Sequence, residues 1–173
     1  MAALQLVVFS GLPGTGKSEL AEAVGRALGI PVFAKDWMEA TVKEFGRTHD
    51  ARAGEIGYGL LTTLAGRQLR LGQSAILDSV ASTASIRQTW RALAAEHGAA
   101  FRVIECLCSD ENVHRARLAE RRRNIPGWPE LEWAEVERVR GYFAPWGDAP
   151  RLVVDMLKPV EENVAAVLNY LKG

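Results

Sequence analysis

The chain has 173 residues, of which 48% are hydrophobic and 24% charged, a composition that fits one globular domain over residues 1–173 and excludes the disordered and fibrous classes. Its 21 lysine and arginine residues balance its 21 aspartate and glutamate residues, so no overall positive field draws it to nucleic acid or to an anionic membrane. No apolar run approaches the roughly 20 residues that span a bilayer, and we therefore expect a cytoplasmic protein with no membrane partner.

Short apolar strands alternate with amphipathic helices along the sequence. Residues Leu4–Phe9 form a near-continuous apolar run that ends in glycines, which is typical of a strand buried on both faces of a parallel sheet. The segment Lys17–Leu28 has apolar residues at helical spacing and stops at Gly29, which predicts a C-terminal cap. We predict further strands at 31–34, 74–77, 101–107 and 152–154, and helices at 37–45, 54–71, 85–96, 111–123, 130–143 and 160–171.

This alternation predicts an α/β fold built on an open parallel sheet. Parallel neighbours need crossover connections, and the connecting helices cover both faces of the sheet. Ligands in such folds bind at the carboxyl ends of the strands. We therefore expect the chemistry in the loops that follow the first, second, third and fifth strands.

The segment from Gly11 to Ser18, GLPGTGKS, matches the phosphate-loop pattern GxxxxGK[ST] between a predicted strand and a predicted helix. Its glycines let successive backbone N–H groups surround phosphates, and the start of the helix adds the positive end of its dipole. Lys17 would reach the β- and γ-phosphate oxygens of a nucleotide, and the Ser18 hydroxyl would ligate Mg²⁺. The complete match and its flanks disfavour the alternative, a glycine-rich turn that binds nothing. The predicted nucleotide-binding set is Gly11, Pro13, Gly14, Thr15, Gly16, Lys17, Ser18 and Leu20.

Two aspartates follow predicted strands and are candidates for the chemistry. Asp78 ends an apolar run and is placed like the Walker-B acid that helps to hold Mg²⁺; its alternative role is to cap a turn before the helix near Ser85. Asp36 follows the second strand and is the candidate general base, which would orient an acceptor hydroxyl and take its proton. Its alternative role is to cap the helix that starts at Trp37.

An arginine-rich segment supplies positive charge for a transferring phosphoryl group. Arg117 and Arg121 are four residues apart in one predicted helix and therefore lie on one face. We interpret this helix as a lid whose Arg117 and Arg121 close over the phosphates as catalytic residues and exclude water. A solvated basic face or a nucleic-acid patch is the alternative. The arginines of the segment are Arg115, Arg117, Arg121, Arg122 and Arg123.

Three tryptophans lie beside prolines in the last third of the chain and could stack on a base or a sugar, although core packing and loop anchoring are commoner uses. They are Trp128, Trp133 and Trp146. The histidines have no triad-like or ligand-like spacing, and we interpret them as structural or surface residues. They are His49, His97 and His114.

Together these residues resemble the small P-loop kinases grouped with polynucleotide kinases, zeta toxins and chloramphenicol phosphotransferases, a group that includes gluconate kinases. The resemblance implies a three-layer P-loop NTPase fold, nucleoside-kinase-like, with a five-stranded parallel sheet and a helical lid at about residues 110–145. Members often carry an arginine three residues after the acceptor-side aspartate, where this sequence has Glu39. This difference disfavours a nucleic-acid 5′ end or another anionic acceptor. The matching segments are Gly11–Ser18, Asp36, Gly72–Asp78, Arg117 with Arg121, Val153–Asp155 and Pro159–Glu162.

The resemblance implies an enzyme, an ATP-dependent kinase that moves the γ-phosphate of Mg-ATP to a hydroxyl of a small polar molecule. ATP and Mg²⁺ are the expected cofactors, and the lack of an N/TKxD guanine-specificity motif favours ATP over GTP. Members of the group phosphorylate sugars, antibiotics, nucleosides and polynucleotide ends, so the fold does not name the acceptor. Two alternatives stay open: a polynucleotide or nucleoside 5′-hydroxyl kinase, and a regulatory ATPase that hydrolyses ATP slowly to control a partner.

Overall fold

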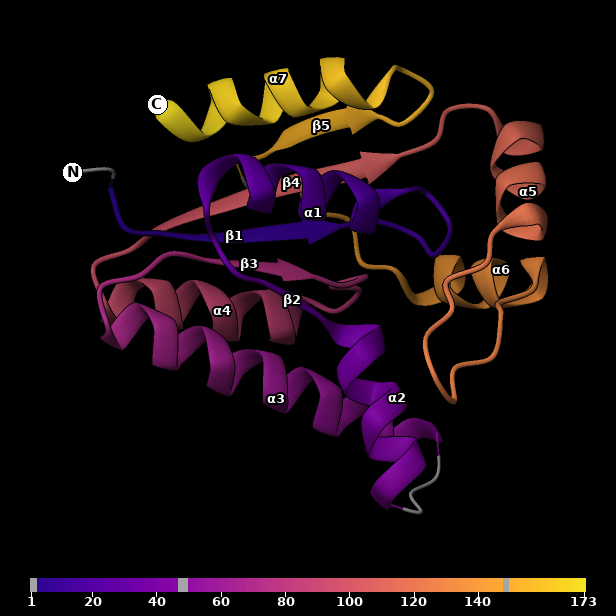
Figure 1. Cartoon of the computed structure of the whole chain (residues 1–173), viewed down its shortest axis with the longest axis horizontal. Coiled ribbons are helices and arrows are strands. Elements are labelled where there is room, and N and C mark those ends of the chain that lie inside the picture. Colours follow the sequence, from indigo (N-terminus) through magenta and orange to yellow (C-terminus); the bar gives the residue numbers. More distant parts are fainter. Residues whose placement is uncertain (1–2, 47–49, 148–149) are drawn as a thin grey trace.

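Five parallel strands form one sheet in the computed structural model, which describes residues 3–46, 50–147 and 150–173 (Figure 1). The strands lie in the order β2-β3-β1-β4-β5, and every neighbouring pair is parallel. The predicted five-stranded parallel sheet is therefore confirmed. The strand bounds are Gln5–Ser10 (β1), Val32–Ala34 (β2), Ala75–Asp78 (β3), Ala100–Leu107 (β4) and Leu152–Asp155 (β5).

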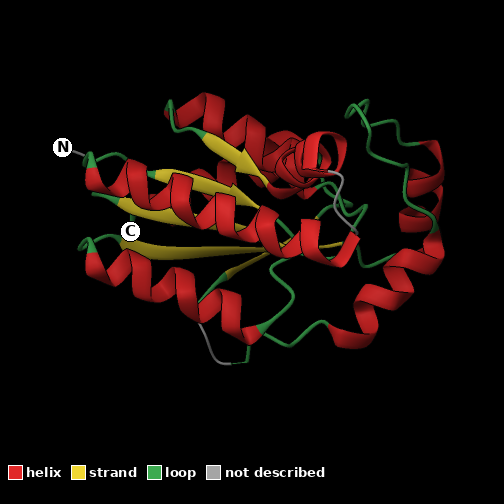
Figure 2. Ribbon diagram, turned by 90° about the horizontal axis from the view of Figure 1, so that it is seen from below, coloured by secondary structure: helices red, strands yellow, loops and turns green. Residues whose placement is uncertain are grey.

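Helices cover both faces of this sheet and extend beyond its carboxyl edge. α1 and α7 lie on one face and α3 and α4 on the other, so the molecule has three layers (Figures 1 and 2). α5 and α6 stand beyond the ends of the strand arrows in Figure 1. No helix within the described ranges combines the length and the apolar character needed to cross a membrane. The helix bounds are Lys17–Leu28 (α1), Lys35–Gly46 (α2), Asp50–Arg70 (α3), Ala84–Glu96 (α4), Glu111–Glu120 (α5), Trp133–Tyr142 (α6) and Val160–Lys172 (α7).

The central strand β1 builds both halves of the hydrophobic core. Leu6 and Val8 pack with α3 and α4, whereas Val7 and Phe9 pack with α1 and α7. All four side chains are fully buried, as the continuous apolar run requires when helices cover both faces. Because β1 is held from both faces and paired on both edges, its carboxyl end fixes the position of the loop that follows it.

The predicted elements agree with the observed bounds to within about a helical turn, but one difference changes the interpretation of the site. The helix predicted at 111–123 ends at Glu120, because Arg121 has extended backbone angles, with φ −62° and ψ 136°. Arg121 is therefore the C-terminal cap of α5, and Arg123 lies in the connection between α5 and α6. The backbone N–H of Arg121 still donates to the Arg117 carbonyl at 3.0 Å, so the predicted four-residue helical spacing holds up to Arg121, and the chain leaves the α5 axis after it.

Gly25 is a tight contact between α1 and the second strand. A Cβ at Gly25 would overlap the Val32 side chain and lie 3.1 Å from the Ile30 carbonyl oxygen. We expect Gly25→Ala to lower the free energy of unfolding by about 1–3 kcal/mol, because a packed interior resists an added methyl group. In the matched control, a Cβ at Gly59 of α3 meets no atom within 4 Å. Gly59→Ala should raise the free energy of unfolding by about 0.5–1 kcal/mol. Urea unfolding measures both changes, and equal effects would contradict the close packing at Gly25.

Candidate active site

The phosphate loop joins the end of β1 to the start of α1. Its glycines have φ values of +150° at Gly11, +80° at Gly14 and +98° at Gly16, which other residues rarely adopt. A Cβ at Gly11 would also overlap the carbonyl oxygen of Cys106 in β4. The loop therefore has the strand, helix and glycine conformations that the phosphate-loop pattern requires, and phosphate binding by its N–H groups stays the prediction that this geometry supports.

Lys17 and Asp78 are the two buried charges beside this loop, with exposures of 7% and 4%. Phe9 lies opposite Asp78 in the register of β1 and β3, which brings the end of β3 next to the start of the loop. Burial raises the pKa of Asp78, while the Lys17 ammonium and a hydrogen bond from Ser18 oppose this rise. Thr83 is the N-cap of α4, so Asp78 does not cap this helix.

The donor atoms at Ser18 and Asp78 fit a Mg²⁺ site. Both offer hard oxygen ligands, and Oδ1 of Asp78 is buried without a hydrogen-bond partner among the described residues. Those residues contain no group of three or more His, Cys, Asp or Glu side chains that could hold a metal by itself. Mg²⁺ is usually bound through one or two protein ligands together with substrate phosphates and waters. A metal at this position would therefore depend on nucleotide phosphates for most of its ligands.

Asp36 lies in the first turn of α2, one residue inside the helix, so it is not the helix cap considered from the sequence. Its Oδ2 accepts a hydrogen bond from Nη1 of Arg123, which forms an ion pair between α2 and the α5–α6 connection. Both partners also influence the pKa of Asp78, so the pair lies within electrostatic reach of the candidate metal ligand. The structure therefore holds the predicted general base against a residue of the predicted lid.

The two arginines that were expected to act together differ in their contacts. Nη1 of Arg117 donates to the carbonyl oxygen of Met156, after β5, at 2.6 Å. Arg121 is half-buried, and its Nε and Nη2 have no hydrogen-bond partner among the described residues. Burial and the neighbouring Arg123 lower the pKa of Arg121, and the Asp36 carboxylate opposes this effect. Arg121 stays the candidate to bind a phosphate, whereas Arg117 holds α5 against the β5–α7 loop.

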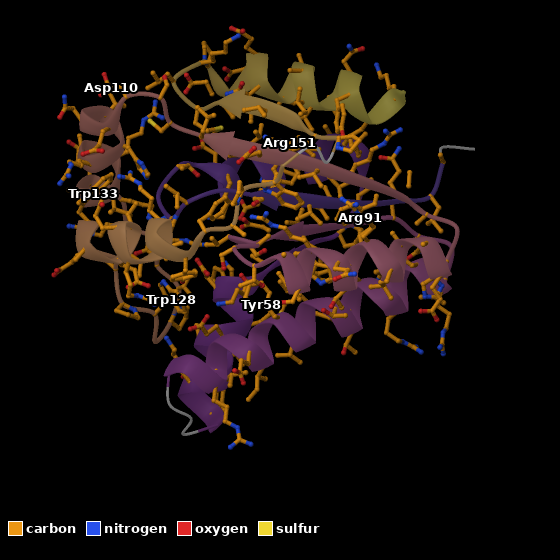
Figure 3. All side chains as sticks on the ribbon, turned by 180° about the vertical axis from the view of Figure 1, so that it is seen from behind. Tyr58, Arg91, Asp110, Trp128, Trp133 and Arg151 are labelled. Carbon is orange, nitrogen blue, oxygen red and sulfur yellow. The ribbon has the colours of Figure 1, made fainter. Side chains whose placement is uncertain are left out.

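A buried carboxylate, Glu39, lies between two lysines on one face of α2. Its Oε2 pairs with Nζ of Lys35, and its Oε1 lies 3.1 Å from Nζ of Lys43. Lys35 also lies 4.9 Å from the centre of the Tyr58 ring, and Lys43 lies 4.5 Å from the centre of the Trp128 ring. Figure 3 shows Tyr58 on α3 and Trp128 on the α5–α6 connection. The two ammonium groups offset the charge of Glu39, and the effect of Glu39 on an anionic acceptor stays a prediction.

The structure places three members of the predicted nucleotide-binding set differently from the rest. Leu20 is fully buried in the core beside α7, and its N–H donates to the Gly16 carbonyl, so Leu20 supports α1 and does not line the site. Pro13 has no N–H, and its carbonyl oxygen is bonded to His114. The Thr15 hydroxyl donates to the Leu12 carbonyl at 3.0 Å, which leaves its backbone N–H as the group available to a phosphate.

The tryptophans anchor the segments around the site. Nε1 of Trp146, which is buried, donates to the Ser10 hydroxyl at 3.2 Å, and the Arg87 guanidinium lies 3.9 Å from the centre of its ring. Trp133 packs edge-on against His114, with ring centres 5.0 Å apart. These contacts match the commoner structural use of tryptophan that the sequence analysis weighed against ligand stacking.

A pocket of about 290 Å³ opens beside the phosphate loop on its β4 side. Its lining comes from the loop, from the end of β4 and from α5 and α6, and includes Leu12, Cys108 and Arg140. Asp36 and Asp78 are not part of this lining. The pocket is therefore separate from the side of the loop where the two aspartates lie.

A comparison with protein-family models shows the family to which this chain belongs. Residues 6–145 match the family described as AAA domain (AAA_33), which is more than half of the 173 residues. The chain belongs to the AAA domain family. No curated protein sequence matches it.

Solved structures of several kinases share the fold of this AAA domain. A candidate kinase from Chloroflexus aurantiacus J-10-fl has a TM-score of 0.76 and 24% identity, over 99% of this chain and 97% of that one. A gluconokinase from Sinorhizobium meliloti 1021 has a TM-score of 0.72 and 18% identity, over 99% and 93% of the two chains. The Mycobacterium tuberculosis APS kinase has a TM-score of 0.61 and 19% identity, over the full length of both chains. The predicted likeness to small P-loop kinases is thus confirmed at the level of the fold.

Sequence reasoning missed three features of this AAA domain site. It grouped Arg123 with a helix, although the break after α5 directs Arg123 to Asp36. It did not use the spacing of Lys35, Glu39 and Lys43, although residues four apart on a helix predict ion pairs on one face. It interpreted His114 as structural or surface, and no sequence signal could have paired it with a residue 101 positions away. Of the other histidines, His97 ends α4 and His49 lies outside the described residues.

We expect Asp78→Asn to stabilise the nucleotide-free AAA domain at neutral pH. The folded-state pKa of Asp78 is raised above its ordinary value of 3.8, so folding favours the neutral carboxyl, and stability falls as the pH rises above that value. The asparagine amide does not ionise, so the variant does not lose this stability as the pH rises. The gain in thermal midpoint should be largest near neutral pH and should shrink as the pH falls toward the ordinary value. Thermal unfolding of both proteins across this range measures the effect. A variant destabilised at neutral pH would show that the Lys17 attraction outweighs the cost of burial.

Proposed function

We propose that this chain is an ATP-dependent kinase that moves the γ-phosphate of Mg-ATP to a hydroxyl group of a small polar molecule. One observation carries the proposal: the strand order β2-β3-β1 places Asp36, Asp78 and the phosphate loop in a row at the carboxyl edge of the sheet. Phosphoryl transfer requires donor phosphates, a metal ligand and an acceptor-orienting group in close succession. The row supplies a residue for each of these roles.

The nucleotide side of the site consists of the loop N–H groups, Lys17, Ser18 and Asp78. Lys17 is nearly buried, so its charge acts on the β- and γ-phosphates with less screening by water. Bound Mg²⁺ would neutralise part of the phosphate charge and orient the phosphate oxygens. Ser18 and Asp78 would hold it, and the unpartnered Oδ1 of Asp78 would gain a partner through the metal or one of its waters.

The acceptor side of the site is built around Asp36. Arg123 bonds one carboxylate oxygen, Oδ2, and orients the group. The other oxygen could accept a hydrogen bond from an acceptor hydroxyl and take its proton during transfer, which is the role of a general base. Arg121 lies near this pair with buried N–H groups that need acceptors, and a transferring phosphoryl group would supply them.

The charges around the acceptor side are compatible with a neutral or an acidic small molecule. Lys35 and Lys43 offset the carboxylate of Glu39, and Tyr58 adds an apolar ring beside Lys35. The names of two similar structures, a gluconokinase and an APS kinase, support phosphate transfer but differ in the acceptor. The class of acceptor is therefore best found by screening matched neutral and acidic alcohols.

The arginine-rich segment does not favour a nucleic-acid acceptor. Arg115 bonds Glu111 in its own helix, at 2.8 Å from Nη2 to Oε1. Arg122 donates to the carbonyl oxygens of Ala119 and Arg121. These arginines are already engaged with neighbouring groups, and the whole chain has a net charge of zero. A polynucleotide kinase remains an outcome of the test below.

The test is Mg-ATP turnover against a mixed panel of sugars, sugar acids, nucleosides, aminoglycosides and 5′-hydroxyl oligonucleotides, with mass spectrometry to detect the gain of one phosphate. We expect one class of small alcohol to be phosphorylated. Asp36→Asn should lower kcat by about 100- to 10,000-fold, because the amide cannot accept the hydroxyl proton. Lys17→Ala should abolish transfer without unfolding the protein.

Two matched control variants each remove one carboxylate or one ammonium group at a position away from the proposed site. Glu22→Gln on the exposed face of α1 and Lys172→Ala at the end of α7 should leave turnover unchanged. Full activity in Lys17→Ala would disprove the assignment of the phosphate loop. ATP binding without a phosphorylated product from any panel member would move the assignment toward the regulatory ATPase.

A further inference from the structure

His114 connects the lid helix α5 to the phosphate loop. His114 is 3% exposed, and its Nε2 lies 2.8 Å from the carbonyl oxygen of Pro13. A carbonyl oxygen can only accept, so Nε2 carries the proton and donates it. Burial lowers the pKa of His114, the hydrogen bond to Pro13 opposes this, and the Arg140 and Lys17 cations lower the pKa further. The neutral ring with its proton on Nε2 is therefore the form that this environment favours.

This hydrogen bond sets the orientation of the peptide group between Pro13 and Gly14. In a trans peptide the C=O and the N–H point in opposite directions, and the described residues contain no cis peptide. Because the Pro13 carbonyl points toward α5, the N–H of Gly14 points away from α5. Gly14 has φ +80° and has no Cβ to restrict it, so the glycine alone does not hold this peptide in one orientation.

The His114 ring is itself held on both sides. A Cβ at Gly14 would lie 2.7 Å from Cδ1 of Leu118 and 3.2 Å from Nε2 of His114, so α5 packs directly on the loop. Behind the ring, Trp133 of α6 packs edge-on with an interplanar angle of 83°. The Arg115 guanidinium lies 4.1 Å from the centre of the Trp133 ring. Figure 3 shows Trp133 beside α5 and α6.

We propose that His114 is a positioning residue of the phosphate loop: its Nε2–H fixes the Pro13–Gly14 peptide so that the Gly14 N–H is preorganised to bind a nucleotide phosphate. The proposal rests on the nucleotide-binding role of the loop given above. In this role the imidazole acts through Pro13. Without the hydrogen bond, the Pro13 carbonyl would be buried without a partner or the peptide would rotate, and in either case the loop would have to reorganise when phosphate binds.

The test is the affinity for ADP, measured by calorimetry on the full chain, in variants that separate hydrogen bonding from packing. His114→Met fills the space without a donor, whereas His114→Gln offers an amide N–H near the position of Nε2–H. We expect the Kd for ADP to rise about 5- to 30-fold in His114→Met and to stay within about threefold of the wild type in His114→Gln. His97→Met, at the end of α4, is the matched control and should bind ADP like the wild type.

A second donor variant guards against misfolding of the methionine variant. His114→Asn keeps the amide but is too short to reach the Pro13 carbonyl, so it should bind ADP as weakly as His114→Met, while thermal unfolding reports the folded state of each protein. Equal ADP affinity in the Gln, Asn and Met variants would overturn the proposal, because a packing role does not depend on a donor at one position. A wild type that fails to bind ADP would overturn the proposed function as well.

Discussion

The parallel register of β1 with β3 and β4 is the constraint on which the functional edge of the molecule depends. In this register Phe9 lies opposite Asp78, so the phosphate loop begins beside the candidate metal ligand. The pairing of β1 with β4 brings Gly11 against the Cys106 carbonyl, where no side chain would fit. A slip by one residue would turn every β1 side chain to the opposite face and would separate these groups. The two-sided burial of β1 in the core makes such a slip costly, and the geometry of the site follows from that burial.

The site keeps charged groups in positions that cost stability. Burial of an ion costs several kcal/mol in order of magnitude unless a partner compensates it. Glu39 has such compensation from two lysines, but Oδ1 of Asp78 and two N–H groups of Arg121 have no partner among the described residues. Unsatisfied buried polar groups are few in folded proteins and call for an explanation. Here the proposed metal and phosphates supply it, because an oxygen and N–H donors are the groups that these ligands would engage.

The α5–α6 region contacts both sides of the proposed reaction. On the nucleotide side, His114 bonds the phosphate loop through Pro13. On the acceptor side, Arg123 pairs with Asp36, and the ammonium group of Lys43 on α2 lies over the Trp128 ring. The α5–α6 region is therefore linked to the phosphate loop and to the candidate base through separate contacts. Binding on either side would act on the same structural element, which gives a physical route for coupling between the two substrates.

The sequence by itself determined the elements whose signals are local. Continuous apolar runs predicted the buried strands, Gly29 predicted the end of α1, and the complete GLPGTGKS pattern predicted the phosphate loop with Lys17 and Ser18. Local signals also predicted that Asp36 and Asp78 follow apolar runs, and in the structure Asp78 ends β3 while Asp36 lies in the first turn of α2. These predictions depend only on neighbours along the chain.

Tertiary structure decided what each side chain contacts. The helix signal of the arginine-rich segment continued past Glu120, and only the folded chain shows that α5 ends there and that Arg123 bonds Asp36. Two lysines of α2 form ion pairs with Glu39 and offset its charge. His114 forms a hydrogen bond with a carbonyl oxygen 101 residues away in the sequence. Such contacts depend on how helices pack beyond the sheet edge. That packing is set by the summed burial of distant side chains, which no local pattern of residues encodes.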